Sequence, residues 1–296
     1  MEMILHIIKH TVEDGIKLLP FLFITYLIME YIEHKMKDKS KNAIKKSGKF
    51  GPIVGSILGV FPQCGFSVSA TNLYAGRVIT LGTLIAVYLS TSDEMLPIFI
   101  SEAVSPVIIF KILGIKLLIG MIAGFIIDFV IVLINRKKKD KNGENEKIEE
   151  TIGSFCDEEH CHCNENGIFK SALKHTLNIF AYIIIILFVI NLLVHLIGEE
   201  NIKNLFLNKP IIGPMISAAI GLIPNCAASV IITNMYLENV ISVSSLIAGL
   251  LTSAGVGLAV LFKTNKGVKN NLGIVFLLYI IGVISGIILE GIGIII

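Results

Sequence analysis

The stretch Phe61-Pro62-Gln63-Cys64-Gly65 indicates how the chain is organised, because Ile223-Pro224-Asn225-Cys226-Ala227 repeats its pattern 162 positions later. Each stretch places a proline, a carboxamide side chain and a cysteine in a row within strongly apolar sequence. The same offset relates further identical residues without a gap, namely Gly51-Pro52 to Gly213-Pro214, Leu84-Ile85-Ala86 to Leu246-Ile247-Ala248, and Gly120 to Gly282. The chain therefore consists of two copies of one sequence repeat.

The composition indicates a membrane protein. Hydrophobic residues make up 54% of the 296 positions and charged residues only 16%, and the mean hydropathy is +0.79. A soluble domain carries about a quarter charged residues. Residues 1–12 lack the apolar core and small-residue cleavage site of a removed signal peptide. We expect the lipid bilayer to surround the chain, and we expect no nucleic-acid partner.

Long apolar runs predict three membrane spans in each copy. A helix of about 20 apolar residues is long enough to cross the hydrocarbon core of a bilayer. The runs that meet this length cover residues 15–33, 78–100, 113–134, 176–197, 240–261 and 271–293.

Between the first and second span of the first copy, residues 50–74 allow two interpretations. The segment either crosses the membrane once or enters as two half-helices that meet near Pro62, which breaks a helix. The lysines of residues 35–49 and the basic run at 136–139 both belong on the cytoplasmic side by the positive-inside rule. An even number of crossings must separate these two basic loops, which favours the re-entrant hairpin.

The second copy starts on the cytoplasmic side and ends outside, so the two copies are expected to be inverted. We predict an all-α polytopic membrane protein of two inverted-topology repeats, each with three spans and a re-entrant hairpin, about ten helices in total. The repeats cover residues 1–135 and 170–296, and a cytoplasmic linker covers 136–169. Both termini are then outside, in a multi-pass protein of a bacterial-type inner membrane. Inverted repeats with broken helices are typical of secondary transporters, whose substrate site lies near the bilayer midplane.

The two cysteine motifs could form one ion site if the repeats meet face to face. A cysteine thiol becomes a thiolate when it binds a metal, and thiolates favour thiophilic ions such as arsenic(III), zinc, cadmium or mercury. Neighbouring carboxamides and hydroxyls would add oxygen ligands. The alternative is that each cysteine is a small apolar packing residue. The candidate set is Pro62, Gln63, Cys64, Ser67, Thr71 and Asn72 with Pro224, Asn225, Cys226, Ser229, Thr233 and Asn234.

A second polar constellation, Ser90-Thr91-Ser92-Asp93-Glu94, corresponds to Thr252-Ser253-Ala254-Gly255. Both stretches lie past the middle of a span and predict a second break in the helix. Ionisable groups inside a membrane are costly and usually functional, so Asp93 and Glu94 could bind a divalent cation or carry a coupling proton. The alternative is that they are hydrated near the outer interface. Asp128 and its counterpart Glu290 lie near span ends, where an interfacial role is expected.

The linker contains a cluster of metal donors. Its spacing fits no standard zinc finger, and the segment is too short to fold around one. Thiols on the cytoplasmic side stay reduced, so the cluster could capture or sense a soft metal. The alternative is an acidic linker with incidental donors. The donors are Cys156, His160, Cys161, His162 and Cys163.

The duplicated proline–carboxamide–cysteine motifs around a His/Cys loop resemble a family of ten-helix heavy-metal exporters. That family is similar to arsenic-efflux permeases, and some of its members are labelled manganese transporters. The resemblance covers essentially the whole chain. It implies a transporter and not an enzyme.

We therefore expect a secondary-type transporter that exports a heavy-metal or metalloid ion by alternating access. The ion is its partner, no resident cofactor is expected, and assembly into a homo-oligomer stays open. The first alternative is a manganese(II) exporter that uses oxygen ligands. Lower alternatives are an intramembrane thiol oxidoreductase, in which Cys64 and Cys226 form a redox pair, and a passive channel.

Overall fold

The computed structural model describes residues 50–61, 64–92, 95–141, 211–265 and 267–292, with scattered positions in 16–27 and 169–189. Side chains are described up to residue 134 of the third range and not at Cys64. All the regular structure in this part is helical, as predicted. Several predicted site residues lie outside it: Pro62, Gln63, Asp93, Glu94, Cys156, His160, Cys161, His162 and Cys163.

The helices of the two copies match one another in order and bounds. In the first copy they are α3 (Gly51–Gly59), α4 (Cys64–Ala75), α5 (Leu81–Ser90), α6 (Met95–Ser101) and α7 (Pro106–Lys141). In the second they are α11 (Ile212–Gly221), α12 (Cys226–Leu237), α13 (Val243–Thr252), α14 (Val256–Thr264) and α15 (Val268–Ile292). The offset of 162 carries the bounds of α4 onto α12 and those of α5 onto α13. The duplication read from the sequence therefore extends to the secondary structure.

Four described segments are long and apolar enough to cross a membrane, namely Leu81–Ser101, Pro106–Ile134, Val243–Thr264 and Val268–Ile292. They correspond to the predicted spans 78–100, 113–134, 240–261 and 271–293. The helices α11 and α12 are apolar but too short to span a bilayer. A turn separates them, and α3 and α4 are likewise two separate helices, which agrees with a broken hairpin in each copy.

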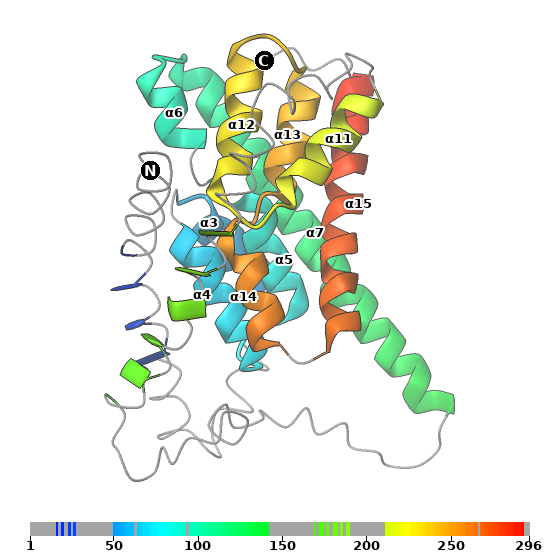
Figure 1. The fold of residues 1–296 in the computed structure, drawn as a ribbon. Helices are drawn as coiled ribbons and strands as arrows, with labels where there is room; N and C mark the ends of the chain where they lie inside the picture. Colours follow the sequence, from blue (N-terminus) through cyan, green and yellow to red (C-terminus); the bar gives the residue numbers. More distant parts are fainter. Residues whose placement is uncertain are drawn as a thin grey trace.

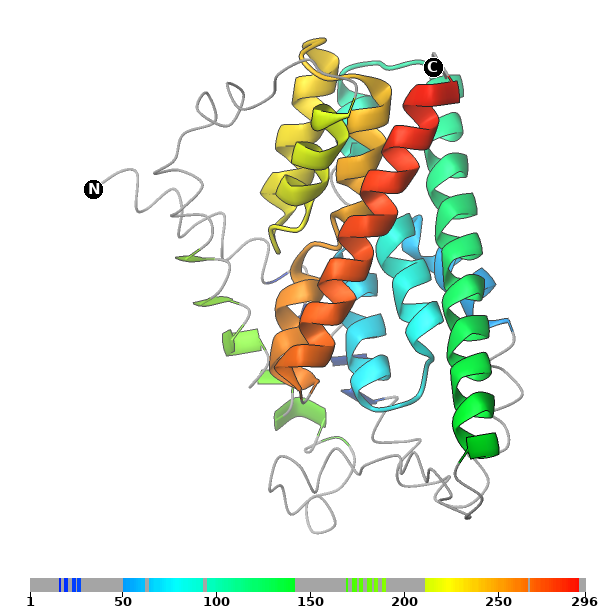
Figure 2. The same cartoon turned by 90° about the vertical axis from the view of Figure 1, so that its right-hand side faces the viewer.

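The long helices of the two copies, α7 and α15, run in opposite directions. Figures 1 and 2 show α7 descending from the top of the molecule, whereas α15 rises from the bottom and ends beside it at the top. Figure 1 also places α4 and α14 in the lower half and α6 and α12 in the upper half. Each broken span thus has one half in each part of the molecule. This is the arrangement that two inverted copies would produce.

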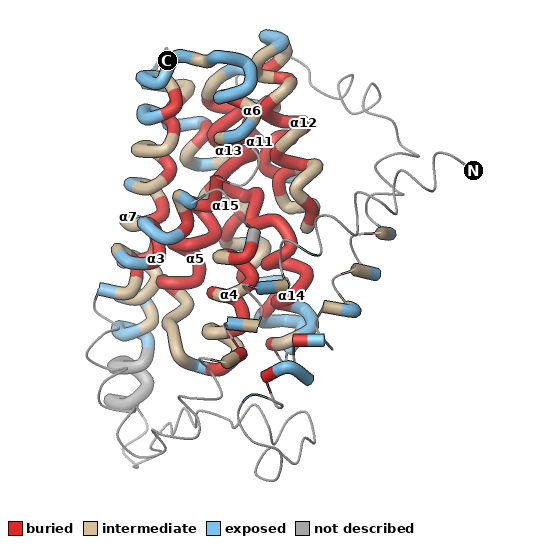
Figure 3. Tube along the Cα trace, turned by 90° about the vertical axis from the view of Figure 1, so that its left-hand side faces the viewer, coloured by how far each residue is buried: buried red, intermediate tan, exposed pale blue. Residues whose placement is uncertain are grey.

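The broken spans form the centre of the molecule. Every residue of α5 from Gly82 to Ser90 is buried, as is every residue of α13 from Ser244 to Thr252. Figure 3 shows the buried segments gathered in the middle of the molecule, while much of α7 is exposed. Its outer face carries Phe110, Phe125 and Phe129, which suits contact with lipid.

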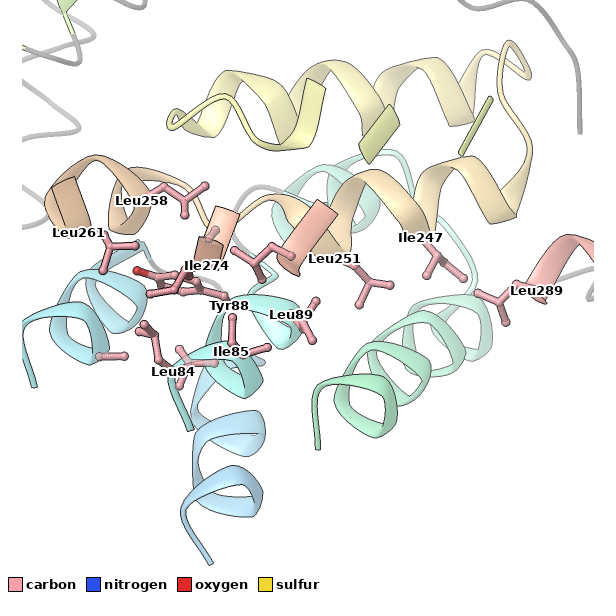
Figure 4. Packing of buried hydrophobic residues seen from close by; sticks show 14 residues of the cluster. Leu84, Ile85, Tyr88, Leu89, Ile247, Leu251, Leu258, Leu261, Ile274 and Leu289 are labelled. Atoms are coloured by element: carbon pink, nitrogen blue, oxygen red, sulfur yellow. The ribbon is translucent and has the colours of Figure 1, made fainter. Parts of the chain in front are cut away.

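The central hydrophobic cluster joins the two copies. In Figure 4, Leu84, Tyr88 and Leu89 of α5 face side chains of the second copy. Those partners include Ile247, Leu251 and Leu258. α5 and α13 are mostly apolar and are surrounded by other helices of the molecule, in the manner of helices in the core of a large protein.

The long helix of each copy holds the start of the broken span through an acid. The hydroxyl of Thr80, the residue that precedes α5, donates to Asp128 Oδ2 at 2.7 Å, and the Gly82 N–H donates to Asp128 Oδ1 at 2.9 Å. In the second copy, the hydroxyls of Ser242 and Ser244 donate to Glu290. A carboxylate at a helix N-terminus is favourable because the unpaired N–H groups there carry partial positive charge. Both acids therefore help to anchor a helix.

Glycines allow the same helices to pack at backbone distance. A Cβ atom on Gly82 would lie 2.2 Å from the carbonyl oxygen of Gly124, and one on Gly124 would lie 2.6 Å from that of Gly82. In the second copy, a Cβ atom on Gly286 would lie 2.8 Å from the side chains of Ala248 and Pro214. Small residues at such crossings are typical of helix packing in membranes. They hold each broken span firmly against its long helix.

Candidate functional site

Each cysteine motif lies at the start of a half-helix. Cys64 and Cys226 are the first residues of α4 and α12. In Figure 1 the two helices leave the middle of the molecule in opposite directions, α4 downward and α12 upward. Cys226 is half-buried and forms no disulfide. The N–H groups at a helix N-terminus stabilise a thiolate, so both positions suit a sulfur that becomes charged on binding an ion.

Asn225 caps the helix that follows it. Its backbone is extended (φ −150°, ψ 149°), and its side-chain oxygen accepts from the Ala227 N–H at 3.3 Å. The residue is only 2% exposed. The proline before it, Pro224, is half-buried in the turn. The carboxamide of this motif thus has a local role in forming the turn, and its oxygen lies at the same helix start as the thiol.

The hydroxyl rows that follow the cysteines are buried and bonded to the helix backbone. Thr71 donates to the Ser67 carbonyl at 2.7 Å, and Thr233 donates to the Ser229 carbonyl at 2.6 Å. Ser229 in turn donates to the Cys226 carbonyl at 2.8 Å. The hydroxyl hydrogens of Ser229 and Thr233 are therefore used within the helix, and their lone pairs are left for an ion.

Thr71 also belongs to a polar contact between the two copies. Its hydroxyl oxygen lies 2.5 Å from that of Tyr88 in α5, and each oxygen lies 3.2 Å from the carbonyl oxygen of Gly257 in α14. A Cβ atom on Gly257 would lie 2.9 Å from Ser67 Cβ, so α4 and α14 touch at this point. The first copy's hydroxyl row is thereby fixed against the second copy's broken span.

Asn72 and Asn234, the predicted carboxamide ligands that follow Thr71 and Thr233, differ in how far they are buried. Asn234 is half-buried. Asn72 is fully buried, and its side-chain oxygen accepts from the Tyr26 hydroxyl at 3.3 Å. Its side-chain nitrogen is buried with no hydrogen-bond partner among the described residues. In this arrangement the Asn72 side-chain oxygen keeps one lone pair beside the Tyr26 hydrogen bond, and its NH2 group is a buried donor.

The predicted second breaks are confirmed at both positions. In the first copy α5 ends at Ser90, and the buried residues Thr91 and Ser92 follow. In the second copy α13 ends at Thr252, and α14 starts after Gly255, whose positive φ of 56° favours glycine. Between them, the hydroxyl of Ser253 is buried and has no partner among the described residues.

One charged residue at these breaks is missed by the sequence analysis. Lys116 of α7 is fully buried, and its Nζ atom donates to the carbonyl oxygens of Thr91 and Leu250, the latter at 3.0 Å. The available signal was a single lysine inside the predicted span 113–134, because an ionisable residue within a membrane is rarely incidental. The position that corresponds to Lys116 in the second copy is Leu278.

No cluster of three or more His, Cys, Asp or Glu side chains is found within the described part of the chain. The described polar residues instead form two groups. One surrounds the helix start at Cys226. The other joins the broken spans of the two copies, through Thr71, Tyr88 and the Gly257 carbonyl and through Lys116 of α7, which donates to Thr91 and Leu250.

Comparison with known proteins gives one match. A family model described as "Putative, 10TM heavy-metal exporter" matches residues 4–162 and 145–264. Neither the search of curated proteins nor that of solved structures found a match.

Proposed function

Since the chain belongs to the 10TM heavy-metal exporter family, we propose that it exports a heavy-metal or metalloid ion as a secondary-type transporter with alternating access. The observation that carries this proposal is the contact between two broken spans, α5–α6 and α13–α14, in the interior of the molecule. Backbone freed from helical bonding cannot face lipid, so it is buried in protein or lines a cavity. Binding sites of secondary transporters are built in this way.

The opposite directions of α7 and α15 support an inverted insertion of the two copies. Two equivalent halves can exchange their conformations, which produces inward-open and outward-open states of similar free energy. In the proposal, the tightly packed pairs α5–α7 and α13–α15 move as units. Lysine-rich loops would place both termini outside and the linker 136–169 in the cytoplasm of a bacterial-type cell.

Cys64 and Cys226 are the proposed sulfur ligands. The helix starts at both cysteines favour the thiolate, and Cys226 is half-buried and forms no disulfide, which is compatible with access from the transport path. The proposed oxygen ligands are Gln63, Ser67, Asn72, Asn225, Ser229 and Asn234. Thr71 and Thr233 are further candidates. Thiolate ligands select thiophilic ions such as arsenic(III), cadmium, zinc or mercury.

A manganese(II) exporter that uses oxygen ligands is the alternative. The side-chain oxygens of Asn72 and Asn225 each accept a hydrogen bond, and a carboxamide oxygen has two lone pairs, so they could serve either kind of site. Asp93 and Glu94 are retained as the proposed coupling acids. The linker cluster, Cys156 with His160, Cys161, His162 and Cys163, is retained as a proposed capture site for soft metal on the cytoplasmic side.

A toxicity panel tests the proposal. Cells that lack or carry the protein would be grown with arsenite, cadmium, zinc or manganese(II), together with cells that carry Cys64→Ser or Cys226→Ser at matched membrane abundance. We expect protection against a thiophilic ion and its loss in both serine variants. Ala227→Ser, which introduces the same hydroxyl one residue further on, is the control and should protect like the unaltered protein. Full protection by both serine variants, or protection against manganese(II) alone, would exclude the sulfur site.

A further inference from the structure

Lys116 connects three segments that are far apart in the sequence. It belongs to α7, and its Nζ atom donates to the carbonyl oxygens of Thr91, which follows α5, and of Leu250, which lies in the last turn of α13. The side chain is fully buried. The side-chain nitrogen of Lys116 therefore lies where both broken spans end.

The backbone carbonyl groups at the ends of α5 and α13 explain why a positive charge is favourable beside them. Carbonyl groups in the last turn of a helix have no donor within the helix. After Leu250 the chain turns away, and the N–H that could have reached its carbonyl, that of Ala254, donates to Thr252 instead at 2.9 Å. The C-terminus of each helix carries about half a negative charge. Two such ends, at α5 and α13, lie against the same Lys116 nitrogen.

This arrangement resembles a site for a small cation. Backbone carbonyl oxygens replace the hydration shell of Na⁺ or K⁺ in selective membrane sites, and hard cations prefer oxygen ligands. A further polar atom is available at the same break, because the Ser253 hydroxyl is buried and has no partner among the described residues. Leu278 occupies the position equivalent to Lys116 in the second copy, so this lysine has no counterpart related by the repeat.

We propose that the Lys116 ammonium is a built-in cation, which fills a monovalent-cation site made by the carbonyl oxygens at the ends of α5 and α13. Two consequences follow. The unaltered protein does not need Na⁺ or K⁺ at this point to hold its broken spans together. Removal of the ammonium, with room left behind, creates a binding site for either ion. Neither consequence depends on which ion the protein transports.

The experiment compares two neutral replacements in the purified full-length chain. Lys116→Ala leaves space for an ion, whereas Lys116→Met fills that space without charge. Thermal unfolding midpoints would be measured in NaCl, KCl and choline chloride at equal ionic strength. Lys111→Met, on the exposed side of the same helix, is the control for loss of a lysine.

We expect the midpoint of Lys116→Ala to rise by about 3 °C when Na⁺ or K⁺ replaces choline, as for an ion well above its dissociation constant. The unaltered protein, Lys111→Met and Lys116→Met should respond to the same exchange by less than about 1 °C. A Lys116→Ala midpoint that is the same in all three salts would overturn the proposal. An equal response in the unaltered protein would overturn it as well.

A second comparison applies if the alanine variant does not accumulate. Lys116→Arg keeps the charge and Lys116→Gln keeps a hydrogen-bond donor without charge. Their extracted amounts would be compared by fluorescence of a fused reporter. We expect several-fold more of the arginine variant, because the ends of the two helices require a cation. An arginine variant that accumulates no better than the glutamine variant would overturn the proposal.

Discussion

The Nζ atom of Lys116 lies 3.0 Å from the carbonyl oxygen of Leu250, a residue 134 positions later and in the other copy of the repeat. Tyr88 and Gly257 form a second such connection, at 3.2 Å across 169 positions. Both connections lie in the interior and join the broken spans. The described helices of the two copies, α3–α7 and α11–α15, therefore share one core.

Removal of the Tyr88 hydroxyl should weaken this shared core. Tyr88→Phe leaves Thr71 and the Gly257 carbonyl with one partner fewer in a buried place, which costs about 1–3 kcal/mol. We expect a lower midpoint of thermal unfolding in detergent. Tyr279→Phe, the same change on the half-buried surface of α15, is the control and should leave the midpoint unchanged. Equal midpoints for the two variants would contradict the role assigned to the Tyr88 hydroxyl.

A methyl group at the crossing of α5 and α7 should disrupt their packing. A Cβ atom on Gly124 would lie 2.6 Å from the Gly82 carbonyl oxygen, and a backbone atom cannot move away without shifting the helix. We expect Gly124→Ala to lose about 1–3 kcal/mol of unfolding free energy. Gly114→Ala lies on the same helix with nothing within 4 Å of its Cβ position, and it should lose none. Denaturant titration of both variants measures the difference.

The carboxylate of Asp128 should be coupled to the hydroxyl of Thr80. Asp128→Ala removes an acceptor from both Thr80 and the Gly82 N–H, so we expect a loss of about 1–3 kcal/mol. Once Asp128 is gone, Thr80→Ala should cost less than it does alone. A double-mutant cycle on unfolding free energies measures this coupling, which should exceed about 0.5 kcal/mol. Strict additivity would show that the hydrogen bond contributes nothing.

The thiol of Cys226 should be protected by the transported ion. A half-buried thiol at a helix start that forms no disulfide is a target for a small thiosulfonate reagent. We expect arsenite or cadmium to slow its labelling about tenfold or more, because a bound thiolate is not free to react, whereas manganese(II) should have little effect. The measurement uses a chain in which the linker cysteines Cys156, Cys161 and Cys163 are serine. Identical labelling rates with and without thiophilic ions would argue against the sulfur site.

The linker cluster should bind metal separately from the membrane part. Elemental analysis of the purified protein after exposure to zinc or cadmium should find less metal when Cys156, Cys161 and Cys163 are replaced by serine. We expect the unfolding midpoint of the membrane part to stay the same, because none of these positions belongs to its described helices. Equal metal content in both proteins would show that the linker cysteines do not bind metal and that the segment is an acidic linker.

Much of the architecture was predictable because its signals are local. Pro62 and Pro224 interrupt a helix through their own covalent structure, so the broken hairpins could be placed from the sequence alone. The breaks near Thr91 and Ser253 were marked by polar residues inside apolar runs. The cysteines were correctly placed beside helix breaks, and their part in binding an ion stays a prediction.

The sequence alone determined the duplication, the four described spans and the positions of the helix breaks. These signals are local, because a proline or glycine interrupts a helix at its own position and a span is recognised from the length of an apolar run. Tertiary structure alone decided which groups meet at those breaks. In the sequence, Lys116 is only a single charge in an apolar run, because the carbonyl oxygens that bind it belong to residues 25 and 134 positions away. No periodicity or motif encodes such a contact, which arises only when two broken helices end at the same point.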